Sequence, residues 1–175
     1  MGLLLSGFLI GRAAAEQPPA GFAEPEEHPV TAELIAEHAS VQPGGTTRLG
    51  IHFEIEEGWH IYADPPVDAG LATAVVWSGL AGVTFGPLLG PKPQTFIDPG
   101  DIRTFGYAGT TVLYSELATN PRMSVGQSLP VHAKVEWLAC HEICIPGSAE
   151  LELALPVSAQ LPVASTHAEF FDHAN

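Results

Sequence analysis

LPVHAKVEWLACHEICIPGSAELELALPV, residues 129–157, is the stretch of sequence that decides the fold. On each side of its centre every second residue is apolar: Val131, Ala133, Val135 and Trp137, and then Leu151, Leu153 and Leu155. This alternation is typical of β-strands with one buried face. The only two cysteines of the chain, Cys140 and Cys144, lie between the two halves. The stretch therefore predicts a β-hairpin with the cysteine pair at or near its tip.

The spacing of the cysteines sets a condition on the backbone. On a straight strand, at about 3.3 Å per residue, their Cα atoms would lie about 13 Å apart, whereas a disulfide needs about 7 Å or less. The chain must therefore turn through residues 141–143 for the pair to bond. A ring this small constrains the unfolded chain only modestly, and strained or exposed disulfides are the readily reduced ones. We interpret Cys140 and Cys144 as a redox-active pair, with a local structural disulfide and a metal-binding thiolate pair as the alternatives.

The composition favours a β-domain and argues against a nucleic-acid partner. The chain has 175 residues, of which 18 are glycine and 16 are proline, and this suits short strands joined by turns better than a helical bundle. Six basic residues stand against 20 acidic ones, giving a net charge of −14. Because binding to phosphates needs a basic face, we expect no nucleic acid among the partners.

Further strands are expected along most of the chain, at residues 48–56, 59–62, 73–77, 82–85 and 110–117. Residues 30–38 also fit a strand, with a helix as the open alternative. Two segments rich in Pro, Gly and Asp, residues 63–73 and 86–100, are expected to form a loop and an irregular excursion. Within residues 48–56 the alternation points Leu49, Ile51 and Phe53 inward and His52 to solvent. Roughly seven to nine short antiparallel strands predict an all-β sandwich of two packed sheets.

The two ends of the chain are predicted to lie outside the sandwich. Residues 1–15 are apolar and end in small residues, which predicts a cleaved signal peptide. Residues 16–29 are rich in Pro, Glu and Ala without periodicity and predict a disordered linker. The domain itself is expected at residues 30–158, followed by a C-terminal tail at residues 159–175. Export would bring the cysteine pair into an oxidising compartment, where disulfides form.

Four motifs in order resemble a known family: GWHIY at residues 58–62, DPPVDAGL at 64–71, FGY at 105–107, and WLAC followed by CIP within 137–146. Together they resemble the N-terminal periplasmic domain of thiol:disulfide interchange proteins of the DsbD and ScsB type. The resemblance runs from about residue 30 to residue 157. The Cys-x-x-x-Cys spacing is similar to that of the ScsB-like branch, because the DsbD branch spaces its pair more widely.

This resemblance implies an immunoglobulin-like fold and a function in thiol–disulfide exchange. In the family, a membrane-embedded electron donor reduces the domain, which in turn reduces periplasmic partners such as thioredoxin-like proteins, disulfide isomerases and cytochrome c maturation factors. It implies that this chain is a protein-disulfide reductase component in the periplasm of a Gram-negative bacterium, with Cys140 and Cys144 as catalytic residues. We expect no cofactor and no small-molecule substrate. The chain is expected either to be part of a longer protein or to use a separately encoded donor.

The expected chemistry starts from a reduced cysteine that attacks a disulfide of the partner, after which the second cysteine resolves the mixed disulfide. A cationic His141 would favour the attacking thiolate, and Glu142 would oppose it. Residues 64–71 are expected to form a loop that shields the pair until a partner docks. The large aromatic residues of the motifs are interpreted as packing residues: Trp59, Tyr62, Tyr107 and Trp137.

Two other functions are open from the residues alone. In the first, Cys140, His141 and Cys144 bind a soft ion such as Cu(I), and His60 or His132 completes the coordination. In the second, the domain is an inert immunoglobulin-like interaction module with an incidental disulfide. A carrier would exchange electrons reversibly near the potentials of periplasmic partners, whereas a structural disulfide would stay oxidised well below them.

Overall fold

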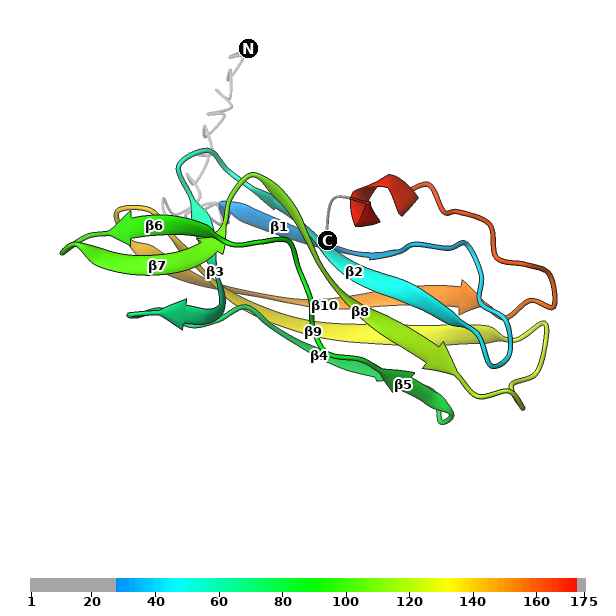
Figure 1. The fold of residues 1–175 in the computed structure, drawn as a ribbon. Helices are drawn as coiled ribbons and strands as arrows, with labels where there is room; N and C mark the ends of the chain where they lie inside the picture. The colour runs from blue at the N-terminus through cyan, green and yellow to red at the C-terminus, as the bar shows by residue number, and fades with distance from the viewer. Residues whose placement is uncertain (1–27, 173–175) are drawn as a thin grey trace, which may run out of the picture.

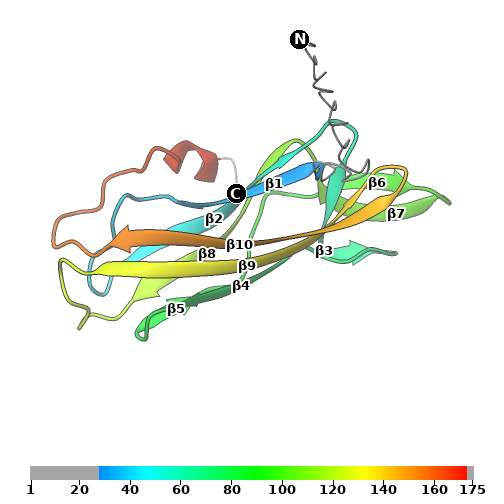
Figure 2. The same cartoon turned by 180° about the vertical axis from the view of Figure 1, so that it is seen from behind.

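The computed structural model describes residues 28–172, and this part of the chain is an all-β, immunoglobulin-like antiparallel sandwich (Figures 1 and 2). Within this range ten strands follow one another: β1 Val30–Ala36, β2 Thr46–Ile55, β3 His60–Val67, β4 Ala74–Gly79, β5 Val83–Phe85, β6 Gln94–Asp98, β7 Ile102–Tyr107, β8 Thr110–Thr119, β9 Ser128–Cys140 and β10 Cys144–Pro156. One sheet has the order β1-β2-β8-β5, and the other has the order β10-β9-β3-β7-β6, with β4 paired to β9. No helix among the described residues is long and apolar enough to cross a membrane.

The core lies between the two sheets and follows the alternation of the sequence. Leu49, Ile51 and Phe53 of β2 are fully buried, as are Val131 and Val135 of β9, and all of them belong to one cluster. Burying a side chain of this size stabilises the fold by roughly 1.5–3 kcal/mol. The inward faces predicted for residues 48–56 and for the β9 strand are therefore confirmed.

Three segments refine the prediction from the sequence. Residues 30–36 form a strand rather than a helix, because they pair with β2 along their whole length. The prediction of a loop at residues 63–73 is partly wrong, since β3 continues to Val67 after a break in its pairing register with β7. The irregular excursion expected at residues 86–100 contains β6, which its prolines flank without interrupting. β6 and β7 form a hairpin in which Gly100 takes a φ of 89°, a conformation that glycine adopts without strain.

The end of the described chain packs on the outer face of the first sheet. After β10 the chain runs beside the residues that follow β1, where Ser165 N–H donates to the Glu37 carbonyl. It then forms a short 3₁₀ turn, η1 Ala168–Phe171, which lies over β1 and β2 (Figure 1). Phe171 is fully buried there, and the ring of Phe170 packs on His52 with the ring centroids 4.4 Å apart and the planes tilted by 35°. The solvent-facing position predicted for His52 is therefore wrong, because η1 covers that face of β2.

The regions predicted at the two ends of the chain have different outcomes. The signal peptide predicted at residues 1–15 and most of the linker predicted at residues 16–29 lie outside the described residues. Within the tail predicted at residues 159–175, the described part reaches residue 172 and includes η1.

Arg48 holds η1 in place, because its guanidinium donates to the carbonyl of Phe171 at 3.0 Å and also pairs with Glu37 at 2.7 Å.

Candidate functional site

The cysteine pair lies at the tip of the β9–β10 hairpin. The two strands pair residue by residue up to Cys140 opposite Cys144, and His141 N–H donates to the Ile143 carbonyl at 3.0 Å to close the turn. The Cα atoms of the two cysteines are 4.1 Å apart and their sulfurs form a disulfide. The turn that the spacing requires is therefore present, and the position at the hairpin tip is confirmed. This tip lies beside β6 and β7 at one end of the sandwich (Figure 2).

The two sulfurs of the disulfide differ in how far a partner can reach them. Cys140 is 1% exposed, because β9 at this point lies between β10 and β3, where Cys140 is opposite His60. Cys144 is exposed on β10, the outer strand of the sheet. A protein that docks at the tip can therefore reach Cys144, while Cys140 stays covered.

The Tyr62 hydroxyl of β3 lies next to the exposed sulfur. Its hydroxyl oxygen is 3.8 Å from Sγ of Cys144 and donates a hydrogen bond to Oδ2 of Asp98 at 2.9 Å. The residue is 3% exposed. Burial raises the pKa of Tyr62 to about 12, and the hydrogen bond to Asp98 and the charge of that carboxylate act in the same direction. Tyr62 is therefore neutral at physiological pH and connects the sulfur to the carboxylate.

Asp98, the last residue of β6, gathers the side chains around it. Oδ2 accepts a second hydrogen bond from the Thr104 hydroxyl at 3.1 Å, and Oδ1 lies 3.3 Å from Nε2 of His60, a contact without good hydrogen-bond geometry. The side chain of Asp98 is 10% exposed. β3 and β7 thus bring three polar side chains to the largely buried carboxylate of β6, next to the disulfide.

His60 is packed as an uncharged ring in this cluster. It is 4% exposed, and its ring stacks on Phe96 at 4.2 Å with an interplanar angle of 6°. Burial lowers the pKa of His60 below its ordinary value, the nearby charge of Asp98 opposes this shift, and His141 adds to it. Burial has the largest effect, so His60 is mostly neutral at neutral pH.

The proposed metal ligands are only partly brought together. His60 lies opposite Cys140, whereas His132 is eight residues back along β9, about 26 Å away at the rise of a strand, and pairs with Glu152 at 3.0 Å. His141 is exposed at the tip beside Trp59, with ring centroids 5.8 Å apart. Among residues 28–172, no group of three or more His, Cys, Asp or Glu side chains is arranged to hold a metal ion. His132 therefore cannot complete a copper site at the cysteines.

The loop expected to shield the pair contacts the tyrosine instead. Gly70 packs so closely on the Tyr62 ring that a Cβ atom there would lie 2.7 Å from a ring carbon. In the described part of the chain, no hydrogen bond joins residues 68–71 to either sulfur. The shielding of the disulfide by residues 64–71 stays a prediction.

Reasoning from the sequence missed two residues of this cluster. The sequence marks Tyr62 only as a packing residue, and it is indeed buried, but its hydroxyl lies next to Cys144. Asp98 falls in a segment expected to be irregular. The alternation in GWHIY does put His60 and Tyr62 on one face of a strand, so the sequence held a signal for two of the residues, but it held none for the carboxylate that joins them.

Comparison with known proteins finds a family model that matches most of the chain. Residues 29–156 match the family model described as "Thiol:disulfide interchange protein DsbD, N-terminal". The N-terminal periplasmic domain of ScsB from Proteus mirabilis is similar in structure, with a TM-score of 0.60 and 20% identity over 86% of this chain and 54% of that chain. This chain therefore spans about half the length of that ScsB structure. The reduced N-terminal domain of DsbD from Neisseria meningitidis has a TM-score of 0.41 and 16% identity, over 74% of this chain and 89% of that one. No curated protein matches the sequence.

Proposed function

Because the chain belongs to the family of N-terminal domains of thiol:disulfide interchange protein DsbD, we propose that it relays electrons to partner proteins through Cys140 and Cys144. One observation carries this proposal. The disulfide is at the tip of a hairpin, and one of its cysteines is exposed while the other is 1% exposed. A structural disulfide has no need of this asymmetry, whereas an exchange reaction needs one sulfur for the partner and one for resolution.

Cys144 is the attacking cysteine in this proposal, and Cys140 is the resolving one. The Cys144 thiolate attacks one sulfur of the partner's disulfide, which forms a mixed disulfide and releases the partner's other sulfur as a thiolate. The thiolate of Cys140 then attacks Sγ of Cys144, which breaks the mixed disulfide and closes the Cys140–Cys144 bond. The partner gains the two electrons and two protons that the cysteines lose.

The cluster around Asp98 gives the attacking thiol a route for its proton. When the pair is reduced, the Cys144 thiol donates to the Tyr62 oxygen, whose own proton already points to Asp98 at 2.9 Å. When the proton has left along this line, the remaining thiolate accepts a hydrogen bond from the Tyr62 hydroxyl. Tyr62 stays neutral throughout, as its raised pKa requires. A hydrogen bond to the charged form of the sulfur favours that form.

The partners and the location are part of the proposal. The electron donor is a membrane-embedded domain of the DsbD or ScsB type, and the acceptors are thioredoxin-like proteins or disulfide isomerases of the periplasm. Residues 1–15 are the signal peptide, residues 16–29 a linker and residues 30–158 the exchange domain. Family membership supports this assignment, and exposure of Cys144 supports a protein as the acceptor.

A redox titration tests the proposed function. The protein is equilibrated in glutathione buffers of stepped ratio, and the fraction of reduced cysteines is counted after alkylation. We expect a reversible two-electron transition between about −120 and −270 mV, the range of thioredoxin-fold oxidoreductases. A pair that is still fully oxidised below about −300 mV would be a structural disulfide, and the proposal would then be wrong.

A further inference from the structure

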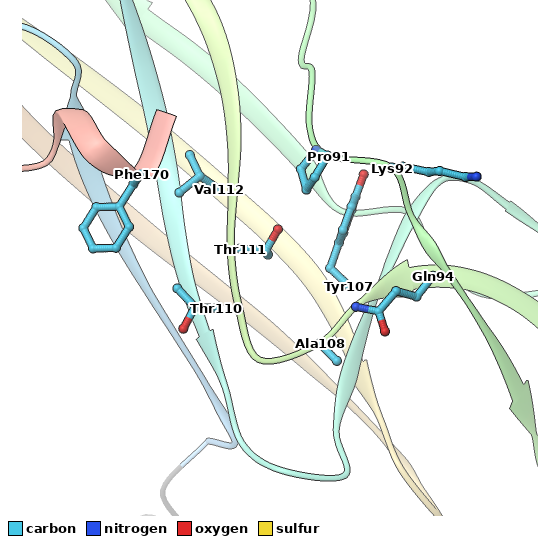
Figure 3. Close-up of a pocket in the computed structure, with 9 residues that line it drawn as sticks. All are labelled: Pro91, Lys92, Gln94, Tyr107, Ala108, Thr110, Thr111, Val112 and Phe170. Atoms are coloured by element: carbon cyan, nitrogen blue, oxygen red, sulfur yellow. The ribbon is translucent and has the colours of Figure 1, made fainter. Parts of the chain in front are cut away.

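A cavity of about 420 Å³ lies at the start of β8 (Figure 3). It is lined by residues 110–112 of β8, by the segment around Lys92 and Gln94, and by Phe170 of η1. Its size falls within the range of roughly 300–1,000 Å³ that is typical of ligand sites. Neither cysteine lines it, so the exchange reaction does not account for it.

Two prolines leave the edge of β8 open at this cavity. Further along the strand, Tyr114 and Leu89 exchange both backbone hydrogen bonds at 2.8 Å. Continuing that antiparallel register by two and four residues brings Pro91 opposite Val112 and Pro93 opposite Thr110. Proline has no backbone N–H and cannot continue a ladder. The segment with Pro91 and Pro93 therefore does not pair with β8 at this point. The cavity lies where the missing hydrogen bonds between them would have formed.

The backbone of β8 points its hydrogen-bonding groups at the opening. In an antiparallel ladder, alternate residues direct their N–H and C=O groups to opposite sides of the strand. The backbones of Tyr114 and Glu116 form hydrogen bonds to residues 86–89, on the side of β8 that faces away from β2. The backbone groups of Val112 and Thr110 therefore point to this side as well. No described backbone group accepts from or donates to these two residues on that side. An open strand edge of this kind is a template for the addition of another strand.

Thr111 adds a side chain without a partner. It is 7% exposed, and its hydroxyl is buried without a hydrogen bond in the described part of the chain. Figure 3 shows the side chain directed to the side of the cavity where Tyr107 and Pro91 lie. Leaving a buried hydroxyl unpaired is unfavourable, so the site lacks one hydrogen-bonding group that a ligand would supply.

The charge of the lining distinguishes the cavity from the rest of the surface. The chain carries a net charge of −14, yet among residues 28–172 no Asp or Glu lines the cavity, and Lys92 does. Lys92 is exposed and makes no ion pair with a described residue. A carboxylate that approaches this opening therefore meets a cation and polar groups.

We propose that the open edge of β8 binds an extended peptide segment with an acidic side chain. The segment adds to the sheet as a strand, and its backbone pairs with Val112 and Thr110 as in other cases of strand addition. One of its polar groups bonds to the Thr111 hydroxyl, and its carboxylate lies next to Lys92. Neither cysteine lines this site, so the segment binds without forming a bond to either sulfur.

The test uses the full chain and a fluorescein-labelled pentapeptide amide of sequence TVEVT. We expect saturable binding with a Kd tighter than about 1 mM, together with shifts of the Val112 and Thr110 amide resonances in ¹⁵N-correlated NMR spectra. The same peptide N-methylated along one edge cannot form the ladder and should not bind. Equal binding of the methylated peptide, the absence of binding, or shifts confined to the hairpin tip would each overturn the proposal.

Two variants probe the side chains. Thr111→Val removes the hydroxyl and keeps the shape, so we expect about fivefold weaker binding, the loss typical of one hydrogen bond, with no loss of thermal stability in the free protein. Lys92→Gln should weaken the TVEVT peptide about two- to fivefold and leave its TVQVT analogue unchanged. Unchanged affinity in both variants would overturn the proposal. Dimers of the free protein that form through β8 would assign the edge to a second copy and would also overturn it.

Discussion

Replacing Tyr62 by Phe tests the proton route of the proposed reaction. The substitution keeps the ring that packs on Gly70 and removes the hydroxyl that lies 3.8 Å from Sγ of Cys144 and 2.9 Å from Asp98. In the reduced protein, the Cys144 thiolate would then lose its hydrogen-bond donor. We therefore expect Cys144 to form its thiolate less readily and to react more slowly.

The size of the effect follows from the strength of that hydrogen bond. A hydrogen bond to a charged group contributes roughly 1.5–3 kcal/mol, which corresponds to an upward move of about 1–2 pH units in the midpoint of thiolate formation. The thiolate fraction at neutral pH then falls about 10- to 100-fold. A more basic thiolate is also more nucleophilic, with a Brønsted coefficient of about 0.4–0.5, and this recovers part of the loss. The net decrease in the rate of disulfide attack is about 3- to 16-fold.

The assay is the pH dependence of alkylation by iodoacetamide in a Cys140→Ser background, where Cys144 is the only thiol. Tyr62→Phe should move the midpoint of the profile upward, and the parallel reaction with a small disulfide should slow by the factor above. Tyr107→Phe is the matched control, because Tyr107 is also a buried tyrosine, but among the described residues its hydroxyl makes no hydrogen bond to a cysteine or to Asp98. Superimposable profiles for Tyr62→Phe and its parent would refute the proton route.

Three further substitutions test the fold around the site. Phe171→Ala should lower the free energy of unfolding by about 3–5 kcal/mol, measured in urea, because the Phe171 side chain of η1 is fully buried. Phe170→Ala should lower it less, and equal effects would contradict the packing of η1. Burial lowers the pKa of His60, so its contribution to stability is complete above its ordinary pKa of 6.5 and is lost as the pH falls through the lower value of the folded protein. His60→Phe should therefore lose less stability than the wild type on acidification below pH 6.5. Parallel curves for His60→Phe and the wild type would argue against it. In Gly106→Ala the added Cβ meets a main-chain carbonyl of β3, so unfolding should become easier by about 1–3 kcal/mol, and wild-type stability would rule out the close approach of β3 and β7.

Much of the sandwich can be predicted from the sequence because its signals are local. The alternation around Ile51 and Val135 is enough to assign a buried face, and the composition is enough to expect antiparallel sheets. The burial of His52 could not be predicted in this way. Its cover comes from Phe170, more than a hundred residues further along the chain, and no periodicity within β2 carries that information. β6 was missed for a similar reason, since it is a strand only because β7 pairs with it.

The same difference between local signals and long-range pairing applies to the candidate site. The sequence predicts the disulfide and the tip of the hairpin, because both cysteines belong to a single local turn. It does not reveal which sulfur is exposed, since that depends on β3 covering Cys140 and leaving Cys144 at the edge of the sheet. The contact between Tyr62 and Asp98 joins residues 36 positions apart and follows only from the pairing of β3, β7 and β6.

The most direct test of the account is a trapping reaction with single-cysteine variants. A thioredoxin-like disulfide isomerase that keeps one active-site cysteine, loaded with thionitrobenzoate, is mixed with either reduced variant, and release of the yellow thionitrobenzoate is followed. We expect Cys140→Ser to form the mixed disulfide rapidly through Cys144 and Cys144→Ser to react at least tenfold more slowly, because Cys140 is 1% exposed. Equal rates for the two variants, or no adduct with either, would contradict the claim that Cys144 is the sulfur that meets the partner.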